Sequence, residues 1–171
     1  MKAHVTMLAT LFVAGCAAMG GSRGPTAVAN LEATKGNETK GTVTFRQDGD
    51  EVRVRVNVTG LKPGAVHGFH VHDKGDCSSG DGMSTGGHFN PAGKPHGPQS
   101  GEHHAGDMPS LTADASGNAN TSFELHGVSI GSGVSDLVGK GLIVHRDPDD
   151  YKTQPTGNAG PRVACAVIRR T

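Results

Sequence analysis

Every second residue of segment 51–58 is a valine, and this alternation constrains the fold more than any other feature. The segment reads Glu-Val-Arg-Val-Arg-Val-Asn-Val, with polar or charged residues between the valines. Side chains alternate between the two faces of a β-strand, so one face is apolar and the other is polar. The pattern predicts a strand of an antiparallel sheet that covers a core on one side and meets solvent on the other.

Seven further segments resemble short strands bounded by turn residues, namely residues 27–34, 41–47, 65–72, 111–115, 120–125, 141–145 and 162–169. Asp-Gly-Asp at 48–50 predicts a hairpin turn, and Ser-Gly-Asn at 116–118 predicts a hairpin between 111–115 and 120–125. The 27 glycines, the single tyrosine and the absence of tryptophan disfavour a helical bundle. We therefore expect an all-β domain, either an antiparallel barrel or a sandwich.

Two long stretches, residues 73–109 and 146–161, have neither strand nor helix periodicity. Loops of this length are uncommon in a compact domain unless they have a function or are pinned in place. The first stretch contains Cys77 and several histidines, which would pin it.

His70 and His72 lie two residues apart in the predicted strand 65–72, within Gly-Phe-His-Val-His. At this spacing both imidazoles are on the same face of a strand, whereas on a helix they would be about 200° apart. Phe69 and Val71 then point the other way, into a core. The pair therefore predicts a metal ion held at the surface of this strand.

The sequence contains ten histidines, which is an unusual enrichment for its length. Imidazole nitrogen is a ligand for both Cu(II) and Zn(II), and three imidazoles with one carboxylate suit tetrahedral zinc. The spacing by itself predicts at least one transition-metal site. The candidate ligands are His70, His72, His88, His96, His104, Asp107 and His145.

The N-terminal residues 1–15 predict a secretory signal, with a basic residue ahead of a short apolar run. The run ends in Val-Ala-Gly-Cys, which resembles a bacterial lipoprotein box and implies cleavage before Cys16 and acylation of its thiol. Ordinary signal cleavage near Ala17 is the alternative. We divide the chain into this signal, a lipidated tether (16–26) and one domain (27–171). If Cys16 carries lipid, Cys77 and Cys165 are the two of the three cysteines left to pair, which fits an oxidising compartment.

Five motifs follow one another along the chain: Gly-Phe-His-Val-His at 68–72, Gly-His-Phe-Asn-Pro at 87–91, His-His-Ala-Gly-Asp at 103–107, Val-His at 144–145 and Gly-Asn-Ala-Gly-Pro-Arg-Val-Ala-Cys at 157–165. Together they closely resemble copper/zinc superoxide dismutase, and most of all its bacterial periplasmic branch. The resemblance implies an eight-stranded antiparallel Greek-key β-barrel, or flattened sandwich, whose two long loops carry the metal site. It also implies a periplasmic enzyme that disproportionates superoxide to dioxygen and hydrogen peroxide by alternate reduction and oxidation of copper.

The resemblance also implies a role for each candidate residue. His70, His72, His88 and His145 would bind copper, while His88, His96, His104 and Asp107 would bind zinc, with His88 as the shared imidazolate. Arg162 matches the guanidinium that attracts and orients superoxide beside the copper. Asp149 matches the carboxylate that joins His70 to His96, and Cys77 and Cys165 match the disulfide of the family.

Several charged or titratable residues are expected to lie outside the metal site. His67 shares the strand parity of Phe69, which predicts a buried, hydrogen-bonded structural histidine. We expect His103 and His126 to be surface residues. Lys152 is a candidate for steering superoxide, and an ordinary solvated lysine is the alternative.

A formal net charge of zero provides no overall field for nucleic acid or an acidic membrane, so membrane contact is expected only through Cys16. Ala17 is not the aspartate associated with inner-membrane retention, which favours the outer membrane. The sequence leaves monomer and homodimer open.

Two other function classes compete with the enzyme: an inactive copper or zinc carrier, and a β-sandwich scaffold without stoichiometric metal. Carriers usually lack a copper ligand or the arginine. Here all four copper ligands of the resemblance (His70, His72, His88 and His145) and Arg162 are present.

Overall fold

The computed structural model describes residues 24–171. The predicted signal segment, the lipidation candidate Cys16 and the tether up to residue 23 lie outside the described residues. Within residues 24–171, no helix has the length and hydrophobicity needed to span a bilayer.

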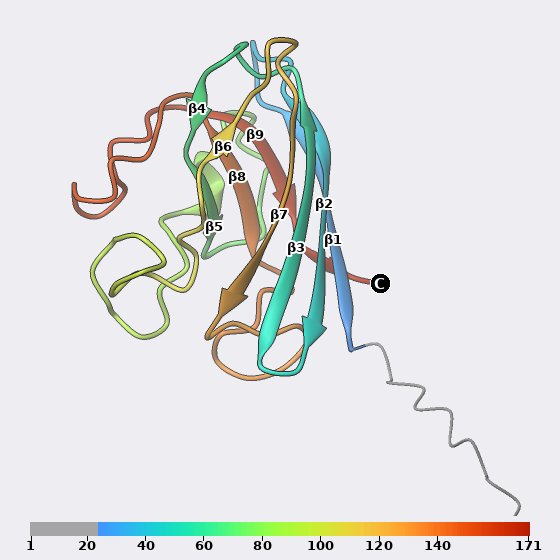
Figure 1. Cartoon of the computed structure of the whole chain (residues 1–171), viewed down its shortest axis with the longest axis vertical. Coiled ribbons are helices and arrows are strands. Elements are labelled where there is room, and N and C mark those ends of the chain that lie inside the picture. The colour runs from blue at the N-terminus through green and yellow to red at the C-terminus, as the bar shows by residue number, and fades with distance from the viewer. Residues whose placement is uncertain (1–23) are drawn as a thin grey trace, which may run out of the picture.

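The described chain folds almost entirely into antiparallel β-strands (Figure 1). The elements are β1 Thr26–Ala33, β2 Lys40–Asp48, β3 Glu51–Thr59, β4 Val66–His67, β5 Phe69–His72, the 3₁₀ helix η1 Met83–Thr85, β6 Leu111–Thr112, β7 Ala119–His126, β8 Gly141–His145, β9 Arg162–Val167 and β10 Arg169–Arg170. Eight strands form one curled sheet in the order β5-β8-β9-β1-β2-β3-β7, with β10 beside β1. The remaining strands, β4 and β6, form a separate pair. The predicted all-β barrel class is confirmed.

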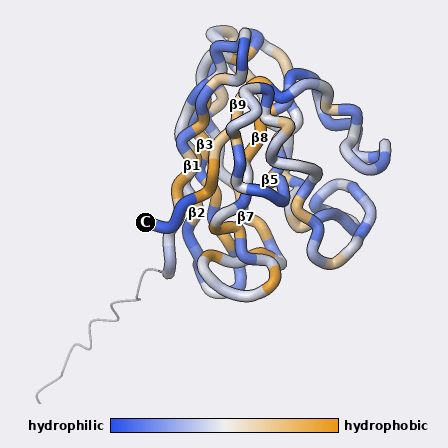
Figure 2. Tube along the Cα trace, turned by 180° about the vertical axis from the view of Figure 1, so that it is seen from behind, coloured by the Kyte–Doolittle hydropathy of each residue, from blue (hydrophilic) through white to orange (hydrophobic). Residues whose placement is uncertain are grey.

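The alternating valines of β3 face the core, as predicted. All four are buried, while the polar and charged residues between them are exposed. β3 pairs with β2 along its whole length and with β7 from Glu51 to Val58, so its buried valines lie beside Phe45 of β2 and Leu125 of β7 on the same face of the sheet. Hydrophobic residues are concentrated on the strands and in the loop after β7, whereas the two long loops are largely hydrophilic or intermediate (Figure 2).

The predicted strand 65–72 is divided in two at Gly68. β4 pairs with β6, whereas β5 crosses to pair with β8. At the break the Gly68 N–H donates to the carbonyl of Asp147 (2.9 Å), and a Cβ at Gly68 would lie 2.7 Å from Ala159 Cβ. This close approach of the 146–161 loop requires glycine. The predicted strand 162–169 is likewise split into β9 and β10.

The predicted hairpin between 111–115 and 120–125 is wrong in its pairing. The turn does form, because the Asp114 carboxylate accepts hydrogen bonds from the N–H groups of Ser116 (2.8 Å) and Asn118 (2.9 Å). However, β6 pairs with β4, while β7 pairs with β3. The turn residues determine where the chain reverses, but they do not determine which strand each of the two flanking strands pairs with.

The two long loops lie on the same side of the molecule, with residues 73–109 beside β5 and residues 146–161 beside β4 (Figure 1). The loop between β5 and β6 returns along the free edge of β5. Val71 donates to the carbonyl of Gly106 (2.8 Å), and its own carbonyl accepts from the N–H of Phe89 (2.8 Å). A Cβ at Gly106 would lie only 2.2 Å from the carbonyl oxygen of Val71, so glycine permits this contact. The loop is therefore held against β5 by backbone hydrogen bonds.

Candidate metal centre

β5 and the loop that returns beside it supply the centre of the site. His70 and His72 are both fully buried, and isolated bridges pair His70 with Asp107 and His72 with His88. The two histidines belong to one group of potential ligands, in agreement with the predicted shared face of the strand, and the returning loop covers that face and brings His88 and Asp107 onto it.

The remaining predicted ligands come from β8 and from the same loop. His145 is the last residue of β8, where the register with β9 shifts, and its N–H donates to the carbonyl of Gly68 (2.8 Å). His96 and His104 lie in the loop between β5 and β6, and both are buried. Segments far apart in the sequence therefore contribute to one cluster.

The seven candidate ligands form two groups that share one residue. In each group the potential ligand atoms all lie within 4.8 Å of one another, and every member is buried. We call them the four-histidine set (His70, His72, His88 and His145) and the mixed set (His88, His96, His104 and Asp107). His88 belongs to both.

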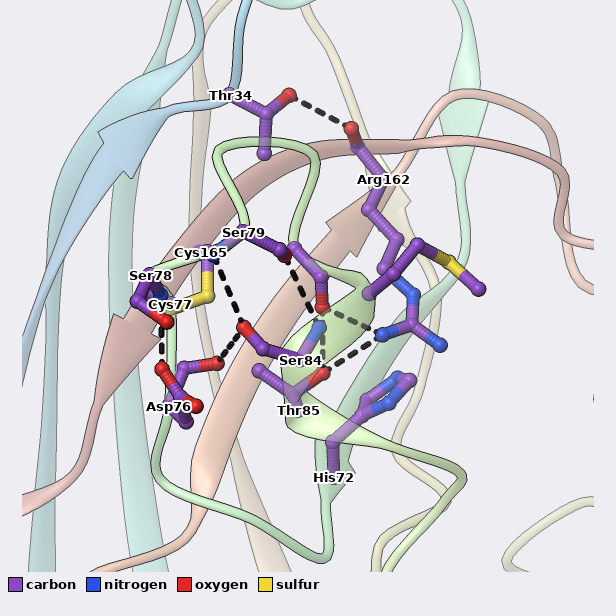
Figure 3. Close-up of a disulfide and its surroundings, with 12 residues drawn as sticks. Thr34, His72, Asp76, Cys77, Ser78, Ser79, Ser84, Thr85, Arg162 and Cys165 are labelled. Atoms are coloured by element: carbon purple, nitrogen blue, oxygen red, sulfur yellow. Dashed lines mark hydrogen bonds between the residues drawn. A yellow bond between two sulfur atoms is a disulfide. The ribbon is translucent and has the colours of Figure 1, made fainter.

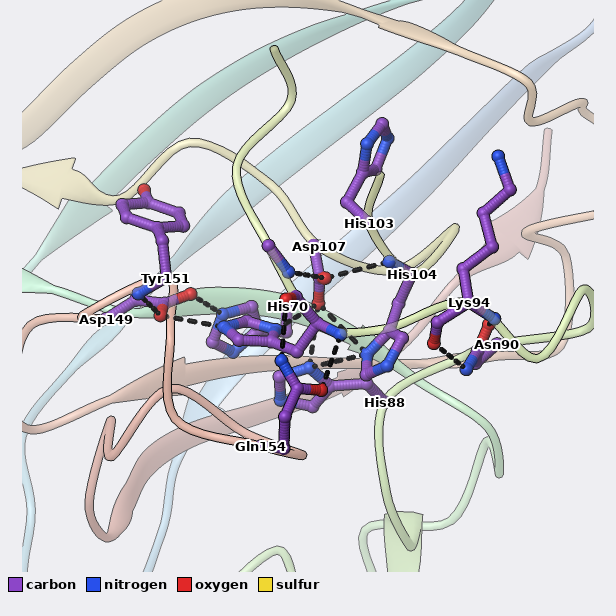
Figure 4. Close-up of polar contacts among 12 residues, drawn as sticks. His70, His88, Asn90, Lys94, His103, His104, Asp107, Asp149, Tyr151 and Gln154 are labelled. Atoms are coloured by element: carbon purple, nitrogen blue, oxygen red, sulfur yellow. Dashed lines mark hydrogen bonds and ion pairs between the residues drawn. The ribbon is translucent and has the colours of Figure 1, made fainter. Parts of the chain in front are cut away.

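The mixed set converges on one oxygen of Asp107 (Figure 4). Asp107 Oδ1 lies 2.8 Å from His88 Nδ1, 3.0 Å from His96 Nδ1 and 3.4 Å from His104 Nδ1. The second oxygen, Oδ2, accepts the N–H groups of His104 (2.9 Å) and Gly97 (3.1 Å), which fixes the carboxylate. Three imidazole nitrogens and one carboxylate oxygen at these separations are the donor set of a tetrahedral zinc site.

The four-histidine set leaves buried nitrogens without a partner. His70 Nδ1 and His88 Nε2 make no hydrogen bond to any described residue. His72 Nε2 and His145 Nε2 lie 3.4 Å apart. Buried polar atoms are normally satisfied, so these convergent lone pairs fit a cation that binds imidazole.

The other ring nitrogens are anchored by groups outside the two sets. Asp149 bridges two rings, with Oδ2 2.7 Å from His70 Nε2 and Oδ1 2.9 Å from His96 Nε2. His72 Nδ1 donates to the carbonyl of Gly86 (2.9 Å), and His145 Nδ1 donates to the carbonyl of Gly160 (3.0 Å). These bonds fix the tautomers and leave the inner nitrogens free to bind metal.

At His70, His145 and Asp107 the local environment favours the protonation states that metal ligation requires. Burial, together with the neighbouring His88 and His145, lowers the pKa of His70 well below its ordinary value of 6.5. Burial lowers the pKa of His145 to about 4. Burial alone would raise the pKa of Asp107, but hydrogen bonds from His88 and from the N–H of His104 hold it far below 3.8. Neutral imidazoles and an ionised carboxylate are the forms that bind metal.

Arg162 lies beside the four-histidine set and is fixed by the loop that follows β5 (Figure 3). Its guanidinium donates to the carbonyls of Gly82 (2.6 Å) and Gly86 (2.7 Å), and to the Thr85 hydroxyl (2.7 Å). Gly86 O also accepts the ring N–H of His72, which places Arg162 next to that histidine. The predicted pair of cysteines forms a disulfide that joins this loop to β9, with a Cα–Cα distance of 6.0 Å.

The sequence profile of copper/zinc superoxide dismutase matches residues 39–168. The chain belongs to the copper/zinc superoxide dismutase family. Similar solved structures include the clock protein EA4, which is 37% identical with a TM-score of 0.78 over 85% of this chain and 94% of that one. A SOD-like protein from Bacillus subtilis is 33% identical (TM-score 0.73, 82% of this chain and 96% of that one). A double mutant of a SOD-like protein from Bacillus subtilis is 34% identical, with a TM-score of 0.73 over 83% of this chain and 96% of that one.

The structure brings together all seven candidate ligands that the superoxide dismutase resemblance implied, along with Asp149 and Arg162. The other predicted histidines lie outside both sets. His67 is buried with Nδ1 2.9 Å from the carbonyl oxygen of His145, as predicted. His126 is exposed, and His103 is partly exposed with Nδ1 2.7 Å from Gly101 O. Lys152 is exposed in the 146–161 loop, and its N–H donates to Asp150 (2.9 Å).

Two residues that support His96 were missed at the sequence level. Gln154 pairs with the backbone of His96 through both ends of its amide, accepting the N–H (2.8 Å) and donating to the carbonyl (2.9 Å). The Tyr151 ring is stacked on the His96 ring with an interplanar angle of 5°. Both residues lie in the aperiodic 146–161 loop, where no pattern in the sequence predicts their contacts.

Proposed function

We propose that this protein is a superoxide dismutase that holds copper in the four-histidine set and zinc in the mixed set. The observation that carries the proposal is the position of His88. Its Nδ1 lies among the mixed set, 2.8 Å from Asp107 Oδ1, while its Nε2 is buried among the four-histidine set without a partner. His70, His72 and His145 each have one nitrogen anchored by an outer group, whereas both nitrogens of His88 face potential metal positions.

The bound metals would supply one-electron redox chemistry at copper, through which two superoxide ions and two protons become dioxygen and hydrogen peroxide, and a fixed charge at zinc. The protein supplies position, charge and a proton site. Arg162 provides a fixed positive charge that attracts a small anion and orients it. His88 can take up a proton at Nε2 and pass it on, because its Nδ1 side is held within the mixed set. Asp149 keeps the rings of His70 and His96 in their orientations through one carboxylate.

We also propose that the protein works in the periplasm, anchored in the outer membrane by lipid on Cys16. The Val-Ala-Gly-Cys sequence supports this location. The Cys77–Cys165 disulfide also supports it, since such bonds persist in oxidising compartments.

The proposal is tested by measuring metal content and superoxide decay on one preparation reconstituted with copper and zinc. We expect about one copper and one zinc per chain, as the two donor sets provide, and rapid superoxide decay after a pulse. The variant His145→Gln should lose copper and activity while keeping zinc. His103→Gln is the matched control, because His103 lies outside both sets.

Each competing function predicts a different result in this experiment. Stoichiometric copper and zinc without superoxide decay would identify a metal carrier and refute the enzyme. A preparation that takes up neither metal would refute both the enzyme and the metal carrier, and the scaffold would remain as the function. Full activity in a copper-free preparation would refute the assignment of the redox site.

A further inference from the structure

Three acceptors fix the guanidinium of Arg162, and one of them is a side chain. Nη1 donates to the carbonyl of Gly82 (2.6 Å) and to Thr85 Oγ1 (2.7 Å), while Nη2 donates to the carbonyl of Gly86 (2.7 Å). A backbone carbonyl is present whatever residue occupies the position. The third acceptor depends on the hydroxyl of Thr85.

Thr85 is itself held rigidly (Figure 3). It is fully buried at the end of η1, and its hydroxyl donates to the carbonyl of Gly82 (2.8 Å). Because the hydroxyl proton is used there, the oxygen presents its lone pairs to Arg162. The methyl group packs against the start of β8, where a Cβ at Gly141 would lie 2.8 Å from Thr85 Cγ2. The side chain thus has a polar contact on one side and a steric contact on the other.

We propose that Thr85 is a positioning residue for superoxide binding, whose hydroxyl sets the orientation of the Arg162 guanidinium beside the four-histidine set. The inference rests on the proposed dismutase function. Without the hydroxyl, Nη1 keeps one acceptor instead of two, and the guanidinium can rotate away from the plane that the three contacts define. The positive charge remains in place, so attraction of the anion over long distances persists while its alignment is lost.

This separation of charge from alignment gives the proposal a specific signature. Replacing Thr85 by the nearly isosteric valine should slow superoxide decay roughly threefold to tenfold, in line with the net contribution of one typical hydrogen bond, since the two carbonyl acceptors still hold the guanidinium. The slope of the rate against ionic strength should stay that of the parent protein, since the charge is unchanged. Thr85→Ser keeps the hydroxyl and should restore the rate to within about twofold of the parent.

The matched control is Ser84→Ala. Ser84 is adjacent to Thr85 on η1, but its hydroxyl donates to the carbonyl of Asp76 (2.6 Å) and does not contact Arg162. We expect this variant to have the parent rate. Metal content is measured on every variant, so that a loss of copper is not mistaken for a loss of alignment.

A second measurement does not depend on activity. In the chemically reduced, metal-loaded protein labelled with ¹⁵N-arginine, the hydrogen-bonded Nη groups of Arg162 should rotate slowly and give separate resonances. These resonances should merge in Thr85→Val and stay separate in Thr85→Ser. If valine disturbs the contact with Gly141 and prevents folding, Thr85→Ala makes the same comparison.

The outcomes separate this inference from the proposed function. Equal rates and equal Nη spectra for the parent protein and Thr85→Val would overturn the role of the hydroxyl. Equal losses in Thr85→Ser and Thr85→Val would overturn it too, because the methyl contact would then be what matters. A fully metallated parent protein without superoxide decay would refute the dismutase, and with it the purpose assigned to Thr85, even if the Nη spectra still responded to the valine variant.

Discussion

Asp149 offers the sharpest test of how the metal centre is organised. Its carboxylate is fully buried and accepts from His70 Nε2 (2.7 Å), His96 Nε2 (2.9 Å) and the N–H of Tyr151 (2.7 Å). In Asp149→Asn the shape is kept, but the amide has one acceptor oxygen, so its NH₂ group faces a ring N–H. One imidazole must then lose its anchor or change tautomer. Loss of such an outer contact lowers metal affinity about 10- to 100-fold, or about 1.4 to 2.7 kcal/mol.

We expect the full loss at the metal whose ring faces the amide NH₂ and a smaller loss at the other metal, whose ring keeps only a neutral oxygen as acceptor, because the two anchored rings belong to different sets. Affinities are measured by titrating the apoprotein with zinc or copper against a chelating dye. Asp147→Asn is the matched control: its carboxylate is partly exposed and pairs with Arg146 at 3.0 Å, without a hydrogen bond to either set. A loss confined to one metal, or an affinity equal to that of the control, would contradict the bridging role.

The remaining predictions concern charge, pH, the disulfide and the anchor. Arg162→Glu should slow superoxide decay and invert its dependence on ionic strength, and an unchanged rate at low salt would remove Arg162 from the site. In the metal-free protein His145 has a pKa of about 4 against an ordinary 6.5, so the unfolded chain binds the extra proton between these values. The free energy of unfolding should therefore fall as the pH drops from about 6.5 to about 4, and urea midpoints that rise on acidification would contradict this. Cys77→Ser removes the disulfide and should lower the free energy of unfolding by about 4–5 kcal/mol, because the unfolded chain is no longer constrained by the closed loop. Thermal unfolding of the parent protein and the variant, with and without reductant, measures this difference. Cys16→Ser should release the protein from membranes, and continued sedimentation with them would refute lipidation.

The strands were predictable where one face is buried and the other is wet. A shift of β3 by one residue would turn its valines from the core to solvent, so the alternation fixes the register. The predicted segment 51–58 differs from β3 by one residue at its end. The pairing of β6 was not predictable, because two residues carry no pattern that selects β4 over β7. The break at Gly68 was also hidden, since its cause is the approach of Ala159 from a loop far along the chain.

The ligands were recognisable because their motifs occur in a fixed order along the chain. The residues that hold the ligands were less visible. Gln154 and Thr85 act through pairs of hydrogen bonds formed in aperiodic segments, and an amide or a hydroxyl in such a segment is more often simply solvated. Asp149 was found only through the family resemblance, since nothing in its local sequence distinguishes it from Asp147 or Asp150.

The way in which the first loop is attached to β5 has a consequence for handling the protein without metal. β5 is the terminal strand of the main sheet, and the hydrogen bonds of Val71 to Gly106 and Phe89 occupy its outer edge. That covering segment also carries His88 and Asp107, so a metal ion bound at these residues would reinforce it. We expect that emptying the centre loosens this segment and exposes unpaired N–H and C=O groups of β5 to strands from other molecules. Demetallated stocks should therefore self-associate at the β5 edge, and keeping zinc in the buffer protects them.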